Sequence, residues 1–206
     1  MLTSGPDISF SSPEFDTAAT IDIAKKLTFY SPYIVPFSFS SPFYKGELWG
    51  GLSRRTFYRT GRRPAALVFV GEESELIKSE PTLTEKARLL AEVGRIEFKA
   101  FDTVSDFSLY QSLGALLLGL ALDTTLEGRA VVPNTALHQH SATHGFSDAL
   151  IHSTAEDVLL AARKALPQEF HEALDRLDQM LESRRSPAHA MIDKYNETGS
   201  IFSAIK

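Results

Sequence analysis

A short stretch near the middle of the chain, RIEFKAFDT at residues 95–103, places a carboxylate and an amine two positions apart. Side chains of a β-strand alternate between its two faces, so Glu97 and Lys99 are predicted to share one face. Arg95 and Phe101 fall on that same face. Two interpretations fit this pattern. It is either a solvated outer face, or the floor of a site where the carboxylate binds a metal and the cation binds a phosphate or second carboxylate.

A second group with chemical potential is the arginine-rich segment LSRRTFYRTGRRP, which directly follows two glycines. The planar guanidinium group suits two-point recognition of phosphate or carboxylate better than a lysine ammonium does. A solvated basic face is the alternative, because the chain offers 26 acidic residues as partners. The arginines of this basic cluster are Arg54, Arg55, Arg59, Arg62 and Arg63.

Three histidines in NTALHQHSATHG, at positions 138, 140 and 144, raise the question of a metal site. On a helix, His140 and His144 would share a face, as in helical zinc sites. The carboxylate that usually accompanies such a pair is absent from the segment, so we expect ordinary polar roles. The sequence also lacks a glycine–lysine phosphate loop, a nucleophile elbow and a dinucleotide-binding fingerprint, which removes several common classes of enzyme.

Composition limits the class of protein. A chain of 206 residues is long enough for one sizeable core, so we expect a single domain over residues 1–206. The net charge of −5 argues against general binding of nucleic acid. The absence of cysteine excludes disulfides and thiolate zinc sites and fits a reducing compartment. The start MLTSGPDISF lacks the features of a signal peptide, and the most apolar run is too short for a bilayer. We therefore expect a cytoplasmic protein without a membrane partner.

The pattern of apolar residues predicts an α+β fold with few strands, antiparallel and packed on helices. Strands are expected at residues 7–11 and in RIEFKAFD, while RPAALVFVG fits either a strand or an apolar loop. Residues 72–94 are expected to form an exposed connection with a short helix at its end. The predicted helices are one starting at Asp16 or Thr17, one over residues 105–123 capped by Ser105 or Asp106, and two amphipathic ones over Ala155–Ala165 and Gln168–Arg185.

Three stretches together resemble the glutamate–cysteine ligase family, including its carboxylate–amine ligase branch. IEFKAFD is similar to the family's strand of type I-E-V-R-x-x-D. SSPFYKGELWGGLSRRTFYR is similar to its S-P-F-x-x-G segment followed by a glycine and S-x-R, and SGPDISFS to its S-G-x-H-x-N-F-S strand. SATHGFSDALI resembles, more weakly, the A-A-R-Y-G-L segment that precedes the family's C-terminal helices. The resemblance covers nearly all of the chain, but only the C-terminal half of the family.

The resemblance implies roles for four residues. Glu97 would bind a catalytic magnesium ion, Lys99 would stand where the family has a phosphate-facing arginine, and Arg55 would touch the transferred phosphate. Asp7 stands where the family has a metal-facing histidine. Lysine keeps the charge of arginine but loses its two-point geometry, so a weaker grip on phosphate is expected. Aspartate remains a good ligand for a hard metal.

The implied fold is the helix-rich half of a glutamine-synthetase-like ligase, and the implied cofactors are ATP and Mg2+. The family's other half brings most of the metal-binding carboxylates and much of the sheet. Two carboxylates are a small set for a nucleotide-bound magnesium ion. We therefore expect a second polypeptide that supplies the missing N-terminal half, or self-association.

The implied reaction joins a carboxylate, expected to be the side chain of glutamate, to the amine of a small amino acid or other amine. ATP would first convert the carboxylate to an acyl phosphate. Arg55 and Lys99 are the expected catalytic and nucleotide-binding residues, and Glu97 and Asp7 the expected metal ligands. The alternative is a non-catalytic half of the same fold that binds a partner or a nucleotide.

Overall fold

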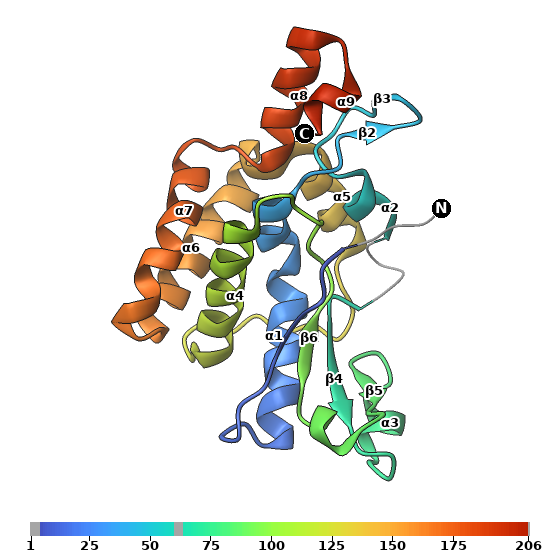
Figure 1. Cartoon of the computed structure of the whole chain (residues 1–206). Helices are drawn as coiled ribbons and strands as arrows, with labels where there is room; N and C mark the ends of the chain where they lie inside the picture. Colours follow the sequence, from blue (N-terminus) through green and yellow to red (C-terminus); the bar gives the residue numbers. More distant parts are fainter. Residues whose placement is uncertain (1–4, 60–63, 206) are drawn as a thin grey trace.

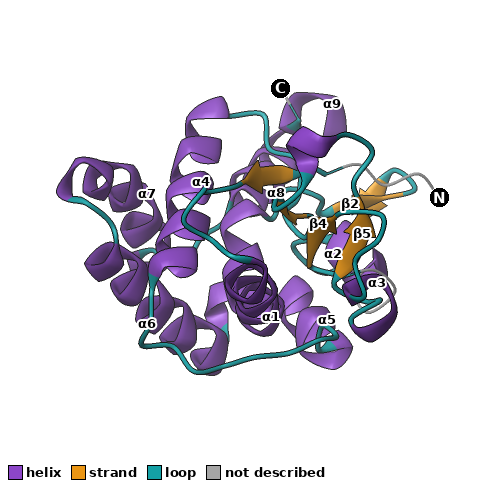
Figure 2. Cartoon of the chain, turned by 90° about the horizontal axis from the view of Figure 1, so that it is seen from below, coloured by secondary structure: helices purple, strands orange, loops and turns teal. Residues whose placement is uncertain are grey.

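The computed structural model describes residues 5–59 and 64–205, which form an α+β fold (Figure 1). Most of the helical residues lie to one side of a small sheet, and the view from below shows the strands on the other side, with short helices beside them (Figure 2). The strands are β1 (Ile8–Phe10), β2 (Phe43–Tyr44), β3 (Glu47–Leu48), β4 (Ala66–Val70), β5 (Thr84–Lys86) and β6 (Ile96–Phe98). The helices are α1 (Thr17–Ile34), α2 (Arg54–Arg59), α3 (Leu76–Ser79), α4 (Phe107–Leu122), α5 (Thr135–His144), α6 (Ala149–Ala165), α7 (His171–Glu182), α8 (Pro187–Thr198) and α9 (Ile201–Ala204).

The long helices begin where polar side chains satisfy their first backbone N–H groups. The Asp16 carboxylate accepts a hydrogen bond from Ala19 N at 2.7 Å, and the Asp106 carboxylate accepts one from Ser108 N at 2.9 Å. The predicted starts of α1 and α4 are therefore confirmed. Helix α1 continues past the predicted region, through Pro32. Pro32 has no N–H for the Thr28 carbonyl, which accepts a hydrogen bond from the Ser31 hydroxyl at 2.8 Å instead.

The main sheet has the strand order β1-β6-β4-β5. Strand β6 pairs antiparallel with both neighbours, and Glu97 lies opposite Ser9 on β1 and Leu67 on β4. One pairing differs from the expectation of antiparallel strands only, because β4 and β5 run parallel. Their connection, residues 71–83, is long enough to contain the short helix α3, and a parallel pair requires such a crossover. The sheet is therefore mixed, and residues 72–94 contain a strand that the sequence did not reveal.

The two faces of the sheet differ in character. Ile96 and Phe98 are fully buried in the hydrophobic core, together with Val68 of β4 and residues of α1 and α4. Phe101 was expected on the opposite, polar face, but it is also fully buried and packs on Phe98 with ring centroids 4.7 Å apart. The reason is that β6 ends at Phe98, so the alternation of faces stops before residue 101. The polar face of β6 therefore consists of Glu97 and its neighbours Arg95 and Lys99.

The three histidines of α5 occupy different environments. His138 is fully buried, with its Nδ1 atom 3.1 Å from the carbonyl oxygen of Asn134. His140 Nε2 lies 2.8 Å from an Asp148 carboxylate oxygen, and its ring centroid is 4.6 Å from that of His144. Burial lowers the pKa of His138 from 6.5 to about 4.

This lowered pKa predicts acid sensitivity. Between pH 6.5 and about 4 the unfolded chain binds a proton at His138 that the folded chain does not, so the free energy of unfolding should decrease as the pH falls through this window. The expected loss is up to about 3 kcal/mol. Urea titrations at several pH values should show a flatter profile for His138→Leu, whereas His144→Leu, at an exposed position, should keep the slope of the parent. Equal slopes for the parent and His138→Leu would contradict the prediction.

Candidate functional site

Glu97 lies at the centre of the polar face of the sheet. Glu97 is only 6% exposed. Its Oε2 atom accepts a hydrogen bond from the Ser9 hydroxyl at 3.4 Å and lies 3.5 Å from the guanidinium of Arg95. Its Oε1 atom forms an ion pair with the Lys99 ammonium. Neighbouring side chains thus enclose the carboxylate, which rules out a simple solvated face at this position.

Lys99 connects the two expected metal ligands. Its Nζ atom is paired with Glu97 and lies 3.6 Å from Asp7 Oδ2. The Asp7 side chain is 48% exposed, whereas that of Glu97 is 8% exposed. The structure therefore brings all three predicted residues together, with one positive group held between two carboxylates.

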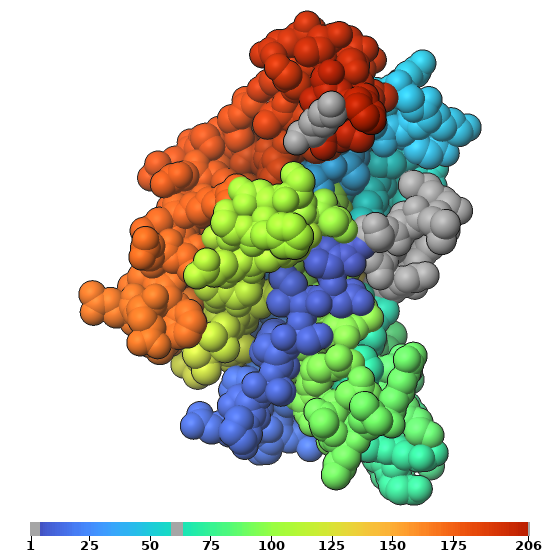
Figure 3. Space-filling model, viewed as in Figure 1, coloured from blue at the N-terminus to red at the C-terminus, as the bar shows by residue number. Residues whose placement is uncertain are grey.

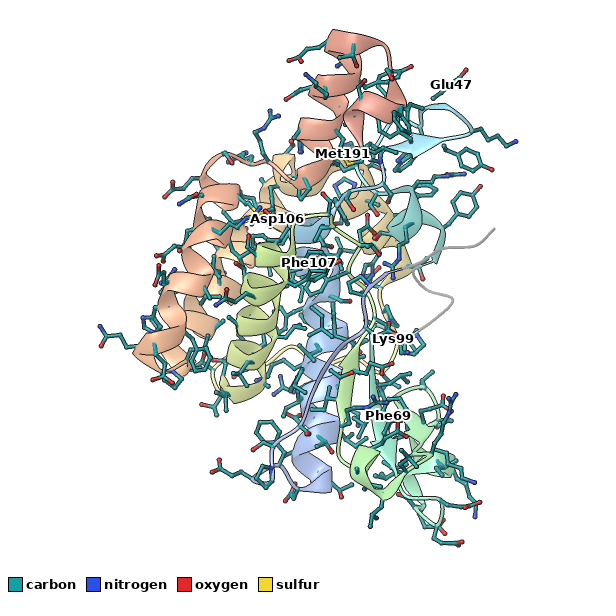
Figure 4. The ribbon with its side chains drawn as sticks, viewed as in Figure 1. Glu47, Phe69, Lys99, Asp106, Phe107 and Met191 are labelled. Atoms are coloured by element: carbon teal, nitrogen blue, oxygen red, sulfur yellow. The ribbon has the colours of Figure 1, made fainter. Side chains whose placement is uncertain are left out.

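Arg95 extends this charged row along the same face. Its guanidinium lies over the Phe69 ring, 4.0 Å from the centroid, and contacts both Glu92 and Glu97. A guanidinium above an aromatic face is attracted by the ring's quadrupole. Figure 4 shows Phe69 and Lys99 on the side of β6 that is away from α1 and α4. Two cations and an aromatic surface thus adjoin the Glu97 carboxylate.

The end of β6 is fixed by the buried carboxylate of Asp102, which is 1% exposed. Its Oδ2 atom accepts hydrogen bonds from Ser40 N at 3.1 Å and from the Ser41 hydroxyl at 2.8 Å. Its Oδ1 atom accepts one from the Ser53 hydroxyl at 3.0 Å. Burial raises the pKa of Asp102, while Arg55 and these donors oppose that shift. Asp102 therefore joins the segment that follows β6 to the loop at Ser40 and Ser41 and to the turn at Ser53.

Arg55 belongs to the same junction. Its Nη1 atom donates to the Ala100 carbonyl and its Nη2 atom to the Lys99 carbonyl, each at 2.9 Å. Nη1 also lies 3.6 Å from Asp102. The residue is 5% exposed. Gly5 lies against the guanidinium so closely that a Cβ atom there would collide with it. Both terminal nitrogens of the Arg55 guanidinium are therefore hydrogen-bonded to the main chain at Lys99 and Ala100.

The four stretches that carry the family resemblance meet at this place. The Ser41 loop and the Ser53 turn share Asp102, and Gly5 touches Arg55. The fourth stretch joins them through the carbonyl of Ala142, which accepts hydrogen bonds from Leu52 N at 2.8 Å and Ser53 N at 3.1 Å. Segments separated by well over a hundred residues therefore form one structural unit next to the polar face.

The rest of the basic cluster has other surroundings. The Arg54 guanidinium lies 3.6 Å from the Tyr58 ring centroid and 4.4 Å from that of Tyr44. It therefore faces an aromatic surface rather than the Glu97 row. Arg62 and Arg63 lie outside the described residues, as does the side chain of Arg59.

Sequence reasoning missed three contributors: Ser9, Arg95 as a partner of Glu97, and Asp102 as the junction. The alternation of β1 places Ser9 opposite Glu97 only once the strand register is known. Asp102 carried a weak signal, because an acidic residue between Phe101 and Thr103 at a strand end is available to accept hydrogen bonds from nearby loops.

The charged row has a donor set that fits part of a magnesium shell. Asp7 and Glu97 provide hard carboxylate oxygens, and the lysine held between them shows that the position favours a cation. No group of three or more His, Cys, Asp or Glu residues within residues 5–59 and 64–205 is arranged to hold a metal. Further oxygen ligands would have to come from water, substrate or another chain.

Arg55 generates a stability prediction. Arg55→Met should lower the free energy of unfolding by about 3 kcal/mol, because it leaves the buried Asp102 carboxylate without its cation and two carbonyls without donors. Arg54→Met, the adjacent control, should lose only about 1 kcal/mol from its aromatic contacts. Urea unfolding followed by circular dichroism measures both. Similar small losses at the two positions would refute the structural role of Arg55.

No helix in the described part of the chain is both long and apolar enough to cross a membrane.

Comparison with protein-family models gives no match, and comparison with curated proteins gives none either. The chemistry of the chain must therefore be argued from its own geometry, and the likeness to the ligase family rests on the motif residues described above.

Proposed function

We propose that this chain is one half of an ATP- and magnesium-dependent ligase that forms an amide between a carboxylate and an amine. The observation that carries the proposal is the meeting of the four motif stretches at Asp102 and Arg55, beside the row formed by Glu97, Lys99 and Asp7. This convergence supports a common site for the motif residues.

The proposed reaction proceeds in two steps. The terminal phosphoryl group of ATP passes to the substrate carboxylate, expected to be the side chain of glutamate, and ADP leaves. The amine then attacks the acyl phosphate, displaces inorganic phosphate and loses a proton to form the amide. Such a reaction depends mainly on positioning and on neutralising the phosphates. Magnesium, when bound, supplies part of that neutralisation.

The residues of the charged row and of the Asp102 junction have different proposed roles. Lys99 is the proposed phosphate-facing cation, and Arg95 provides a second positive group on the same face. Glu97 and Asp7 are the proposed metal ligands. Arg55 acts as a positioning residue, since its hydrogen bonds fix the backbone of Lys99 and Ala100. This assignment replaces direct contact with phosphate, which would require Arg55 to give up those bonds.

A second polypeptide, or a second copy of this chain, is proposed to complete the site. The described sheet ends in two edge strands, β1 and β5, and an edge strand can pair with a further strand through its outer backbone groups. Edge β1 lies next to the strand that carries Glu97. A partner strand added there would bring further side chains to the polar face.

The alternative is a non-catalytic half that binds a partner or a nucleotide. It is favoured by the placement of Lys99, whose ammonium already neutralises the two carboxylates. Co-purification of the native complex, followed by measurement of ADP release with a panel of amino acids and amines, separates the two functions. ADP release that depends on both an acid and an amine supports the ligase. A complex that binds ATP but releases no ADP with any pair supports the alternative.

Glu97 provides a test of the metal role. Glu97→Gln keeps the shape of the side chain and removes its charge, so the affinity of the complex for Mg2+ and ATP together should fall about a hundredfold. Glu72→Gln, an exposed carboxylate that is also paired with a lysine, serves as the matched control and should bind as the parent does. Calorimetry measures both affinities, and circular dichroism checks the fold. Unchanged binding in Glu97→Gln would reduce Glu97 to a structural acid.

Lys99 provides a complementary test on the isolated chain. Lys99→Met removes the ammonium that occupies the space between the carboxylates, so binding of Mn2+ alone should strengthen by about tenfold or more while binding of ATP weakens. Lys99→Arg restores a two-point grip and should bind ATP more tightly than the parent. The Mn2+ affinity is measured by electron paramagnetic resonance. Equal Mn2+ affinity in the parent and Lys99→Met would show that the Lys99 ammonium does not occupy a position where a metal ion can bind.

A further inference from the structure

The guanidinium of Arg54 lies apart from the charged row, among aromatic side chains. Its central carbon is 3.6 Å from the ring centroid of Tyr58 and 4.4 Å from that of Tyr44. The rings of Trp49 and Phe57 follow at 5.5 and 5.8 Å. These five residues, here called the Arg54 cluster, come from the β2–β3 region and α2. Figure 3 shows this light-blue region at the surface, beside the red C-terminal helices.

The side-chain nitrogens of Arg54 have no acceptor within the described residues. The Nε atom is buried without a hydrogen-bond partner, and the guanidinium contacts aromatic rings alone. A buried polar group without a partner is uncommon and requires an explanation. Other arginines of the described chain each pair with a carboxylate: Arg55, Arg95, Arg129, Arg163, Arg176 and Arg185. Arg54 therefore keeps its N–H donors for a group outside the described chain.

A second cation approaches the cluster from the turn of the hairpin. Lys45 Nζ lies 5.5 Å from the centroid of the Tyr44 ring. Lys45 has a φ of 52°, in the left-handed region, and Gly46 follows with a φ of 89°. Asparagine and glycine are the usual residues in such a tight hairpin turn. Lysine at this position costs backbone energy, and residues held at such a cost are concentrated at sites that bind ligands.

No carboxylate of the described residues neutralises either cation. Glu47, opposite Tyr44 in the hairpin, is exposed and forms no ion pair with them. Figure 4 labels it at the hairpin. The chain as a whole has a net charge of −5, so two cations at one place without a carboxylate partner are a local exception. Charge complementarity at this cluster selects an anion.

We propose that the Arg54 cluster binds a phosphate monoester, carried by a small molecule or by a side chain of a partner protein. The planar fork of Arg54 suits two phosphate oxygens, and the exposed Lys45 can turn toward a third. A phosphate monoester carries a charge of about −1.5 to −2 near pH 7, which matches two cations better than a carboxylate does. The rings of Tyr44 and Tyr58 restrict the guanidinium, so little conformational entropy is lost on binding. This site does not depend on the proposed ligase function.

The chain contains its own reporter of binding. Trp49 is the only tryptophan and lies in the cluster, so its fluorescence should respond to a ligand at Arg54. Titration of the purified chain with methyl phosphate at constant ionic strength should give a saturable change, and acetate should bind at least about fivefold more weakly. Arg54→Lys keeps the charge and loses the fork, so it should weaken methyl phosphate binding about tenfold. Lys45→Asn should weaken it about threefold and keep the fold, because asparagine suits the turn.

Matched variants separate this site from other positive groups. Arg88→Lys and Lys164→Asn make the same changes at exposed positions outside the cluster and should bind as the parent does. Lys99→Met, in the charged row, should also leave the Trp49 response unchanged.

A phosphoserine peptide identifies the source of the phosphate. Affinity equal to that of methyl phosphate supports a small-molecule ligand, and tighter binding supports a partner protein. The proposal is overturned if millimolar methyl phosphate gives no saturable change in fluorescence or in calorimetry, or if acetate binds as tightly. It is also overturned if Lys99→Met abolishes the response, or if Arg88→Lys weakens binding as much as Arg54→Lys.

Discussion

The buried carboxylate of Asp102 is the interaction on which the arrangement of this molecule depends. A charge removed from water is costly unless every oxygen has partners, so the serine loops, Arg55 and the end of β6 have to come to one point. The direction in which Lys99 leaves the sheet follows from that meeting, because Arg55 binds its carbonyl. The proposed role of the polar face therefore depends on this polar junction, which fixes the backbone of Lys99.

The polar face combines groups of opposite charge at close range. Glu97 contacts Lys99 on one oxygen and Arg95 on the other, and Asp7 approaches the same lysine from the less buried side. The positive and negative groups of this row neutralise one another in the chain alone. In the proposed function they would exchange partners with a phosphate and a divalent cation. The exposed side of Asp7 and the open strand edge mark the direction from which a ligand or partner would approach.

The sequence predicted the parts of the molecule that depend on local pattern. The caps at Asp16 and Asp106 and the shared face of Glu97 and Lys99 follow from side-chain chemistry and from alternation along a strand. The parallel strand β5 was missed because its three residues, Thr84 to Lys86, carry no apolar alternation; their pairing with β4 is set by the crossover. The contact of Arg55 with main-chain carbonyls could not be predicted from the sequence either. A sequence motif identifies a side chain, but it does not identify the atoms to which that side chain binds.

The register of the sheet has a consequence for how the chain acquires its structure. Ser9 and Glu97, which face each other across β1 and β6, are separated by 88 positions, whereas α6 and α7 follow one another directly along the chain. Closing so long a loop is slow compared with forming neighbouring helices. During synthesis β1 has no strand to pair with until β6 has been made, whereas β4 can pair first with β5, its other neighbour. Among the contacts of the sheet, the pairing of β1 with β6 closes the longest loop, so we expect it to form after the pairing of β4 with its neighbours. The contact between Asp7 and Lys99 depends on that pairing.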